Sequence, residues 1–265
     1  ERSATKAPRA QEKLPFTVSA ATTAITGPLN ADGTVDYVTA WNQKYGAGVT
    51  SAENGFAVGA GAWALMKQND ARPLLMAGGT LPAAADRREP YLNYLNDEYE
   101  GYGAAFREKK YDAMLAAGRR VWTPTELPDL TAYLQKEKKS LDLILLAAAR
   151  PKWWTPLVSG DGRSMDSAPM VGEIPGLREL DNLIGARATC RAGMGDFDGF
   201  LADLLAVKRV ARHMSSRSGL EYDVGLEMDA CADRAIGAVA ARGILTAAQC
   251  ATLSNALREM KTIER

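Results

Sequence analysis

The sequence predicts an all-α protein of antiparallel helical hairpins in a solenoid-like array, with a short extended segment near the N-terminus. Three observations support this fold class. Residues 176–265 contain no proline, the residue that most strongly breaks helix interiors. Thr246 and Gln249 have the spacing of a helix-capping box. Apolar residues recur three and four apart between Phe197 and Met214, which gives a helix one face to bury.

The first half of the chain is predicted to be mostly helical but interrupted. β-Branched residues between Phe16 and Leu29 favour a short extended segment. A turn at Asp32–Gly33 precedes an expected helix from about Thr34 to Tyr45. The capping-box spacing of residues 50–53 predicts a second helix that extends to about residue 67. Further helices are expected over residues 86–96, 99–118, 129–139 and 141–149.

The second half is predicted to form four long helices. They are expected over about residues 175–192, 196–217, 218–243 and 246–263. Gly193 and Gly195 mark the first turn, and Ser218 and Glu221 have capping-box spacing at the start of the third helix. Because the connections are short, consecutive helices must run antiparallel.

Composition divides the chain into parts. All but three of the aromatic residues lie at or before Trp154, and the last proline is Pro175. We therefore expect a flexible N-terminal segment over 1–16, an aromatic-rich and mostly helical part over 17–150, a connecting loop over 151–175 and a helical array over 176–265. The alternative is that these parts form one continuous domain.

Charge and hydropathy argue against nucleic-acid binding and against a membrane-spanning helix in this sequence. Lys+Arg and Asp+Glu both number 32, so the formal net charge is zero. Nucleic-acid binding through the phosphate backbone requires a surplus of basic residues, so no nucleic-acid partner is expected. A membrane-spanning helix needs about 18 or more consecutive apolar residues, and no such run occurs. The chain begins with Glu1 rather than Met, which indicates a processed or truncated N-terminus.

The sequence predicts no cofactor and no metal. Its soft metal ligands are His213, Cys190, Cys231 and Cys250, without the CxxC spacing of a zinc site. Residues 30–36 partly resemble a calcium-binding loop. When Gly33 is aligned with the invariant glycine of such a loop, Pro28 and Thr39 fall at ligand positions that need carboxylates, so no calcium site is expected. No phosphate-binding loop is present. Cys231 and Cys250 either pack as small apolar residues or pair with each other.

A catalytic role would depend on pairs of acids. Asp223 and Glu227 lie four apart on a predicted helix, and Asp161 and Asp166 lie in the connecting loop. A helical hydrolase would combine one acid of each pair, since hydrolysis commonly uses two carboxylates. The ordinary interpretation of acids at helical spacing is surface charge. His213 lies among basic residues, whose charge is expected to lower its pKa, and we interpret it as a surface or boundary histidine rather than a catalytic base.

Two features are candidates for binding. The candidate binding residues are Trp153, Trp154, Arg163, Lys208, Arg209 and Arg212. The adjacent tryptophans either stack on a ligand or fill the junction between the two halves of the chain. The three basic residues of the predicted helix either hold an acidic partner or form a solvated helix face.

Three groups of short stretches carry a resemblance to a family. They are Thr22–Leu29 with Asp32–Val38, Pro128–Leu130 with Leu141–Leu143 and Ala149–Pro151, and Ala186–Ala188 with Asp203–Leu205 and Arg209–Arg212. Their pattern resembles an uncharacterised family of secreted or envelope-associated helical proteins from planctomycete bacteria. The resemblance implies an extracytoplasmic or envelope-associated location. The family has no established activity, so no residue role is carried over.

A second resemblance concerns the turn before residue 197. Gly195, Asp196 and Phe197 resemble the turn of a tetratricopeptide (TPR) hairpin, and Gly199 occupies the small-residue position after it. Arg191 stands where an aromatic residue is usual, and no repeat of about 34 residues is visible. This degenerate TPR-like pattern implies a helical interaction scaffold. We therefore expect a non-enzymatic scaffold or binding protein of the cell envelope that recognises a protein or polymer, with the helical hydrolase as the alternative.

Overall fold

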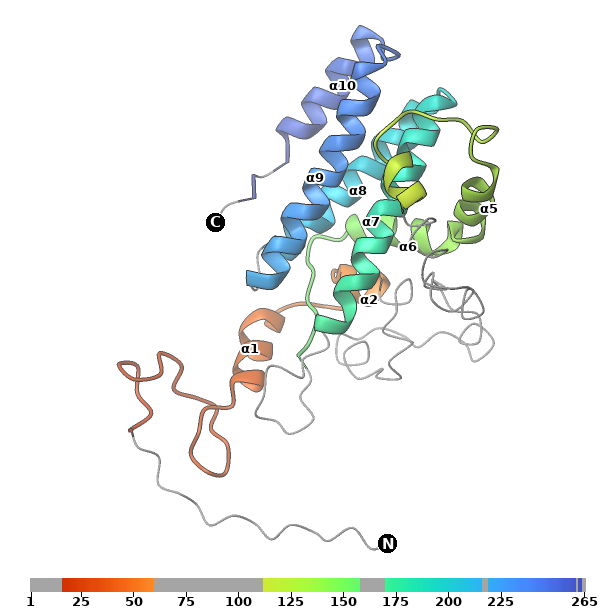
Figure 1. Cartoon of the computed structure of the whole chain (residues 1–265). Helices are drawn as coiled ribbons and strands as arrows, with labels where there is room; N and C mark the ends of the chain where they lie inside the picture. Colours follow the sequence, from red (N-terminus) through yellow and green to blue (C-terminus); the bar gives the residue numbers. More distant parts are fainter. Residues whose placement is uncertain (1–15, 60–111, 158–169, 216–218, 261, 264–265) are drawn as a thin grey trace, which may run out of the picture. The chain divides into compact units, whose positions relative to one another are not determined.

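The computed structural model describes residues 16–59, 112–157, 170–215, 219–260 and 262–263 (Figure 1). The all-α prediction is confirmed, since the described residues form helices joined by turns and isolated β-bridges. They belong to two compact units. The first contains the described residues up to Gly48 together with residues 156–157, and the second contains the rest. No helix in these ranges is long and apolar enough to cross a membrane.

The first unit contains helix α1, Tyr37–Gly46. Its N-cap is Asp36, whose carboxylate accepts hydrogen bonds from the Thr39 backbone at 2.9 Å and the Thr39 hydroxyl at 2.7 Å. The helix therefore starts later than the predicted Thr34. Thr34 instead closes the preceding turn, where its backbone N–H and its hydroxyl both donate to Asp32. A carboxylate is a strong N-cap, and two acids compete for this role within five residues.

The second unit is built around three long helices that pack on one another. They are α7 (Met170–Gly193), α8 (Phe197–Ser215) and α9 (Gly219–Ala241), which lie side by side in Figure 1. Helix α10 (Ala247–Arg258) packs on α8. Helix α5 (Pro128–Lys136) leads into α6 (Lys138–Ala148), which contacts α7, α8 and the short α2 (Gly55–Gly59). Helices α7 and α8 are joined by the short turn of residues 194–196, and each of α7, α8 and α9 packs on the other two.

Most predicted helix ends are close to the observed ones. The capping box at Thr246 and Gln249 is present, with both reciprocal hydrogen bonds. Helix α7 begins before the predicted start at Pro175 and continues through it. The capping box predicted for residues 50–53 is wrong, because the Thr50 hydroxyl instead bonds the Glu53 carboxylate at 3.0 Å and α2 begins only at Gly55. The helix predicted over 86–96 and most of that over 99–118 lie outside the described residues, although residues 112–117 are helical.

A buried indole fixes the chain before α5 against α7. Trp122 is fully buried, and its Nε1 donates to the Ala186 carbonyl and the Thr189 hydroxyl, both at 3.1 Å. The Thr189 hydroxyl donates to the Ala117 carbonyl at 2.9 Å. Gly193 allows the close approach, because a Cβ atom at this position would lie 2.1 Å from the Trp122 carbonyl oxygen.

A buried carboxylate joins α7 and α8. Asp203 on α8 is fully buried, and both of its oxygens accept from Arg187 on α7, at 2.6 and 3.1 Å. Arg191, one turn further along α7, reaches the same carboxylate at 2.9 Å. Arg187 also bonds Asp142 on α6 at 3.1 Å. One ionic group therefore connects three helices, with each buried charge compensated.

We expect Asp203→Asn to lower the free energy of unfolding by about 3–5 kcal/mol, because it leaves buried guanidinium charge without its carboxylate. Asp198→Asn changes an exposed acid of the same helix and is expected to stay within about 0.5 kcal/mol of wild type. Urea unfolding followed by far-UV circular dichroism measures both. Equal stabilities for the two variants would contradict the structural role of Asp203.

Candidate functional site

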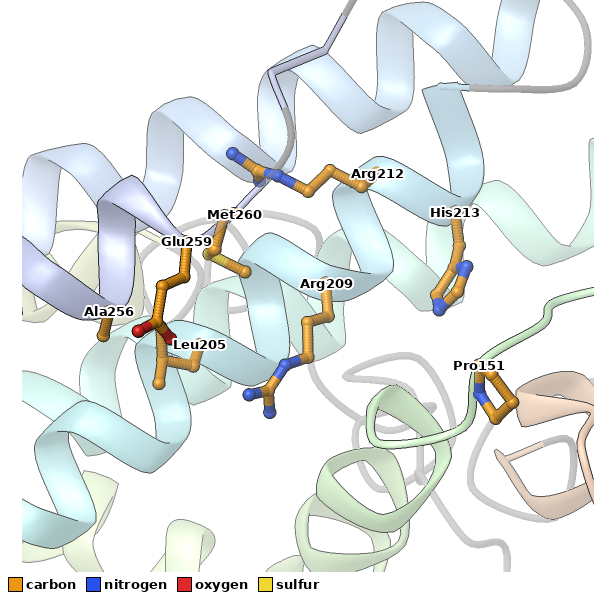
Figure 2. A pocket seen from close by; sticks show the side chains of 8 residues that line it. All are labelled: Pro151, Leu205, Arg209, Arg212, His213, Ala256, Glu259 and Met260. Atoms are coloured by element: carbon orange, nitrogen blue, oxygen red, sulfur yellow. The ribbon is translucent and has the colours of Figure 1, made fainter.

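A pocket of about 550 Å³ lies between α8, the end of α10 and the chain that follows α6 (Figure 2). It is lined by Pro151, Leu205, Arg209, Arg212, His213, Ala256, Glu259 and Met260. Four of these residues come from one face of α8, where positions four apart are neighbours. The walls are therefore mixed, with aliphatic surface beside basic groups and one acid.

The basic cluster predicted on α8 is divided by the fold. Lys208 is buried and pairs with Asp229 at 2.9 Å and Asp233 at 2.8 Å on α9. Arg212 pairs with the same Asp229 at 2.8 Å. Burial acts to raise the pKa of Asp229, but the hydrogen bonds from Lys208 and Arg212 outweigh it and lower the pKa. Both basic side chains are thus used to hold α8 against α9.

Arg209 differs from these two neighbours. Its side chain is exposed, and it makes no ion pair with any residue that the structure describes. In Figure 2 the two guanidinium groups lie apart, that of Arg209 below that of Arg212. An arginine in this state presents a planar fork of donors that matches a carboxylate or phosphate. Of the predicted basic cluster, Arg209 is the residue placed to meet an anion in the pocket.

The single histidine of the chain forms one end of the pocket. The ring of His213 stacks on that of Trp153, with centroids 5.8 Å apart and planes 26° apart. Its Nε2 lies 3.2 Å from the Arg150 carbonyl oxygen. Burial lowers the pKa of His213, and the hydrogen bond to that carbonyl opposes the shift. The predicted direction of this shift was right, but its main cause is burial rather than neighbouring positive charge.

Trp153 itself is part of the core of the second unit. Only 7% of it is exposed, and it belongs to the same buried cluster as Phe56 of α2. A Cβ atom at Gly55 would lie 2.5 Å from a carbon of the Trp153 ring and 2.5 Å from the Ala147 carbonyl oxygen. The indole therefore fills a space that a glycine leaves open. This position corresponds to the packing alternative for the loop tryptophans rather than to a ligand-stacking surface.

Asparagine side chains hold the backbone that follows Trp153. In the second unit, Asn54 pairs with both backbone groups of Trp154, at 2.8 Å each. In the first unit, Asn42 pairs in the same way with Leu157, at 2.9 and 2.8 Å. The start of the predicted connecting loop is therefore held in a fixed conformation. Arg163, the remaining predicted binding residue of that loop, lies outside the described residues.

The acids of the alternative hydrolase are placed as follows. Asp223 and Glu227 lie on α9 and are exposed. Glu227 pairs with Arg178 of α7 at 2.8 Å. Asp161 and Asp166 lie outside the described residues.

A buried acid and thiol lie between α7 and α9. Asp181 is 3% exposed, and its Oδ1 accepts no hydrogen bond from any described residue. Burial raises the pKa of Asp181 well above its ordinary value, with Arg234 opposing and Glu227 reinforcing the shift. Burial also raises the pKa of the neighbouring Cys231 thiol to about 12, so this thiol is a poor nucleophile.

The three cysteines are free thiols, and Cys231 is buried whereas Cys250 is exposed, so the two are not paired. Within the described part of the chain, no group of three or more His, Cys, Asp or Glu side chains is arranged to hold a metal ion. The pocket residues that sequence analysis did not propose are Pro151, Leu205, His213, Ala256, Glu259 and Met260. The four-residue spacing of Leu205, Arg209 and His213 was a signal for a shared face, but nothing local indicated that the end of α10 would cover it.

Comparison with known proteins gives no relative: no protein-family model, no curated protein and no solved structure matches this chain at a significant level.

We expect Gly55→Ala to destabilise the protein by about 1–3 kcal/mol, since the added methyl group collides with Trp153 and with backbone. Trp153→Ala is expected to cost about 3–5 kcal/mol through the cavity it leaves. Gly237→Ala is the matched control, because nothing lies within 4 Å of its added Cβ on α9, and it is expected to stabilise by up to about 1 kcal/mol. Thermal unfolding of the three variants measures these effects, and a neutral Gly55→Ala would contradict the packing described.

We expect Asp181→Asn to stabilise the protein relative to wild type, and increasingly so as pH rises above the ordinary carboxyl pKa of about 3.9. The folded-state pKa of Asp181 lies above its unfolded value, so its contribution to stability is full at low pH and is lost as pH rises through the folded pKa. Asparagine keeps the shape without acquiring charge. Chemical unfolding at several pH values tests this, with Asp223→Asn on the exposed face of α9 as the control. A pH-independent difference between Asp181→Asn and wild type would refute it.

Proposed function

We propose that this chain is a non-enzymatic helical scaffold, with a TPR-like hairpin arrangement, that binds an acidic segment of a partner protein in the pocket between α8 and α10. The observation that carries the proposal is Arg209, an exposed arginine without an ion pair to any described residue, on the wall of a partly apolar pocket. On the sequence resemblance, we place this scaffold in the cell envelope or outside the cytoplasm.

The size of the pocket supports a short peptide segment as the ligand. Its volume of about 550 Å³ is within the range of ligand pockets, about 300–1,000 Å³. Such a space accommodates a few side chains rather than a folded domain. Helical scaffolds bind short segments of their partners on faces of this kind.

The chemistry of the walls supports an acidic and apolar segment. Arg209 offers a bidentate site for a carboxylate, whereas Leu205 and Met260 offer aliphatic surface beside it. Methionine adapts its shape to different apolar side chains. Glu259 would repel a run of several acids, so the pocket favours a single acidic residue flanked by apolar ones. A polysaccharide is less well matched, because the lining residues that the structure describes include no tryptophan, tyrosine or phenylalanine.

A random-peptide phage library selected on the immobilised full chain tests the proposal. We expect the enriched peptides to share an acidic residue next to aliphatic ones. Synthetic copies should bind Arg209→Glu at least about tenfold more weakly, since a hydrogen bond to a charged group contributes about 1.5–3 kcal/mol.

Arg242→Glu is the matched control, because Arg242 is exposed on the loop that follows α9 and does not line the pocket. It carries the same change of charge and should bind the peptides as wild type does. Peptides that bind Arg209→Glu and wild type equally, or a selection without any acidic consensus, would overturn the proposed ligand.

A further inference from the structure

We propose that the pocket takes up its anion together with a proton on His213, so that an acidic ligand binds more tightly as pH falls. This inference rests on the proposed function for the identity of the ligand. The coupling itself belongs to His213 and Arg209 and is testable with a simple anion.

The two side chains that take part in the coupling belong to the same helix. Arg209 and His213 are four residues apart on α8, and both line the pocket. An anion paired with Arg209 therefore lies on the same helix face as the imidazole. Figure 2 shows the His213 ring extending from α8 toward the side of the pocket where Pro151 lies.

The imidazole ring of His213 is held by two contacts. The Arg150 carbonyl oxygen can only accept a hydrogen bond, so Nε2 of His213 carries a hydrogen in both protonation states. Stacking on Trp153 fixes the plane of the ring. Protonation at Nδ1 therefore keeps the hydrogen bond of Nε2 to Arg150.

Charged side chains on neighbouring elements determine the electrostatic surroundings of the His213 ring. On α8, Arg212 faces the pocket but is compensated by Asp229 at 2.8 Å. In the chain after α6, Lys152 pairs with Glu53 at 3.3 Å, and the Arg150 guanidinium donates to the Ala52 carbonyl at 2.8 Å.

After α10, Glu259 lines the same pocket as the ring, so an acid is already present there. On the histidine's own helix face, Arg209 remains as a cation without an ion pair to any described residue. In the empty pocket the burial of the ring favours neutral His213. A bound anion neutralises Arg209 and adds negative charge nearby, which favours the imidazolium.

Linkage makes the effect reciprocal: an anion that favours protonated His213 is itself bound more tightly when His213 is protonated. A rise of about one unit in the pKa of His213 on saturation corresponds to about tenfold tighter binding to the protonated form. The consequence is a site whose affinity for an acidic ligand rises as pH falls.

The test follows the imidazole directly by NMR in the full chain labelled with ¹⁵N-histidine, which gives the signals of one residue because the chain has a single histidine. Its titration is recorded in sodium chloride and in sodium sulfate at equal ionic strength. Sulfate is the probe because its charge is constant across the titration. We expect sulfate to raise the His213 midpoint by about half a unit or more in wild type and to leave it unchanged in Arg209→Gln.

Arg242→Gln is the control and should retain the full sulfate effect, since Arg242 is exposed and does not line the pocket. A sulfate effect that persists in Arg209→Gln, or equal midpoints in the two salts for wild type, would overturn the coupling. Neither outcome bears on the peptide selection, which judges the proposed function separately. If peptides bind but their affinity for wild type and for His213→Gln has the same pH dependence, the binding function stands and the proton coupling is wrong.

Discussion

The buried carboxylate of Asp203 is the constraint on which the arrangement of the second unit depends. A fully buried charge is tolerated only where it is compensated, and its compensation comes from two arginines one turn apart on α7. Apolar contacts alone allow two helices to slide, but two guanidinium groups on one carboxylate allow a single register. Because Arg187 also bonds Asp142, the same group fixes α6.

The position of α6 in turn determines the surroundings of the pocket. Helix α2 packs on α6, and Gly55 of α2 leaves the space that Trp153 occupies. Trp153 then stacks on His213 of α8. A chain of contacts thus leads from the buried ion pair to the imidazole at the pocket, and each contact is between side chains held by packing. The site is therefore built on rigid elements, which limits the entropy lost when a ligand binds.

Some charged side chains of α8 pair with neighbouring helices, whereas Arg209 is left to contact a ligand. Asp203 and Lys208 are buried and pair with charged residues of α7 and α9, and Arg212 joins the second of these groups. Arg209, between Lys208 and Arg212 in sequence, points to the pocket instead. A run of basic residues that resembles one patch in sequence is therefore two groups in space, because successive residues of a helix are about 100° apart around its axis.

The sequence by itself determined the fold class and most of the helices, because these depend on local properties. Absence of proline, four-residue apolar spacing and the Thr246 capping box act within one helix and can be recognised without knowing its neighbours. The competition between Asp32, Thr34 and Asp36 for the cap of α1 was also local, but similar side chains made its outcome hard to predict. Only the tertiary structure decided which charges are buried, that Trp153 packs against Gly55, and that the end of α10 completes a pocket with Arg209 and His213. These features join residues distant in sequence, and their formation depends on the burial and pairing that folding of the whole unit imposes.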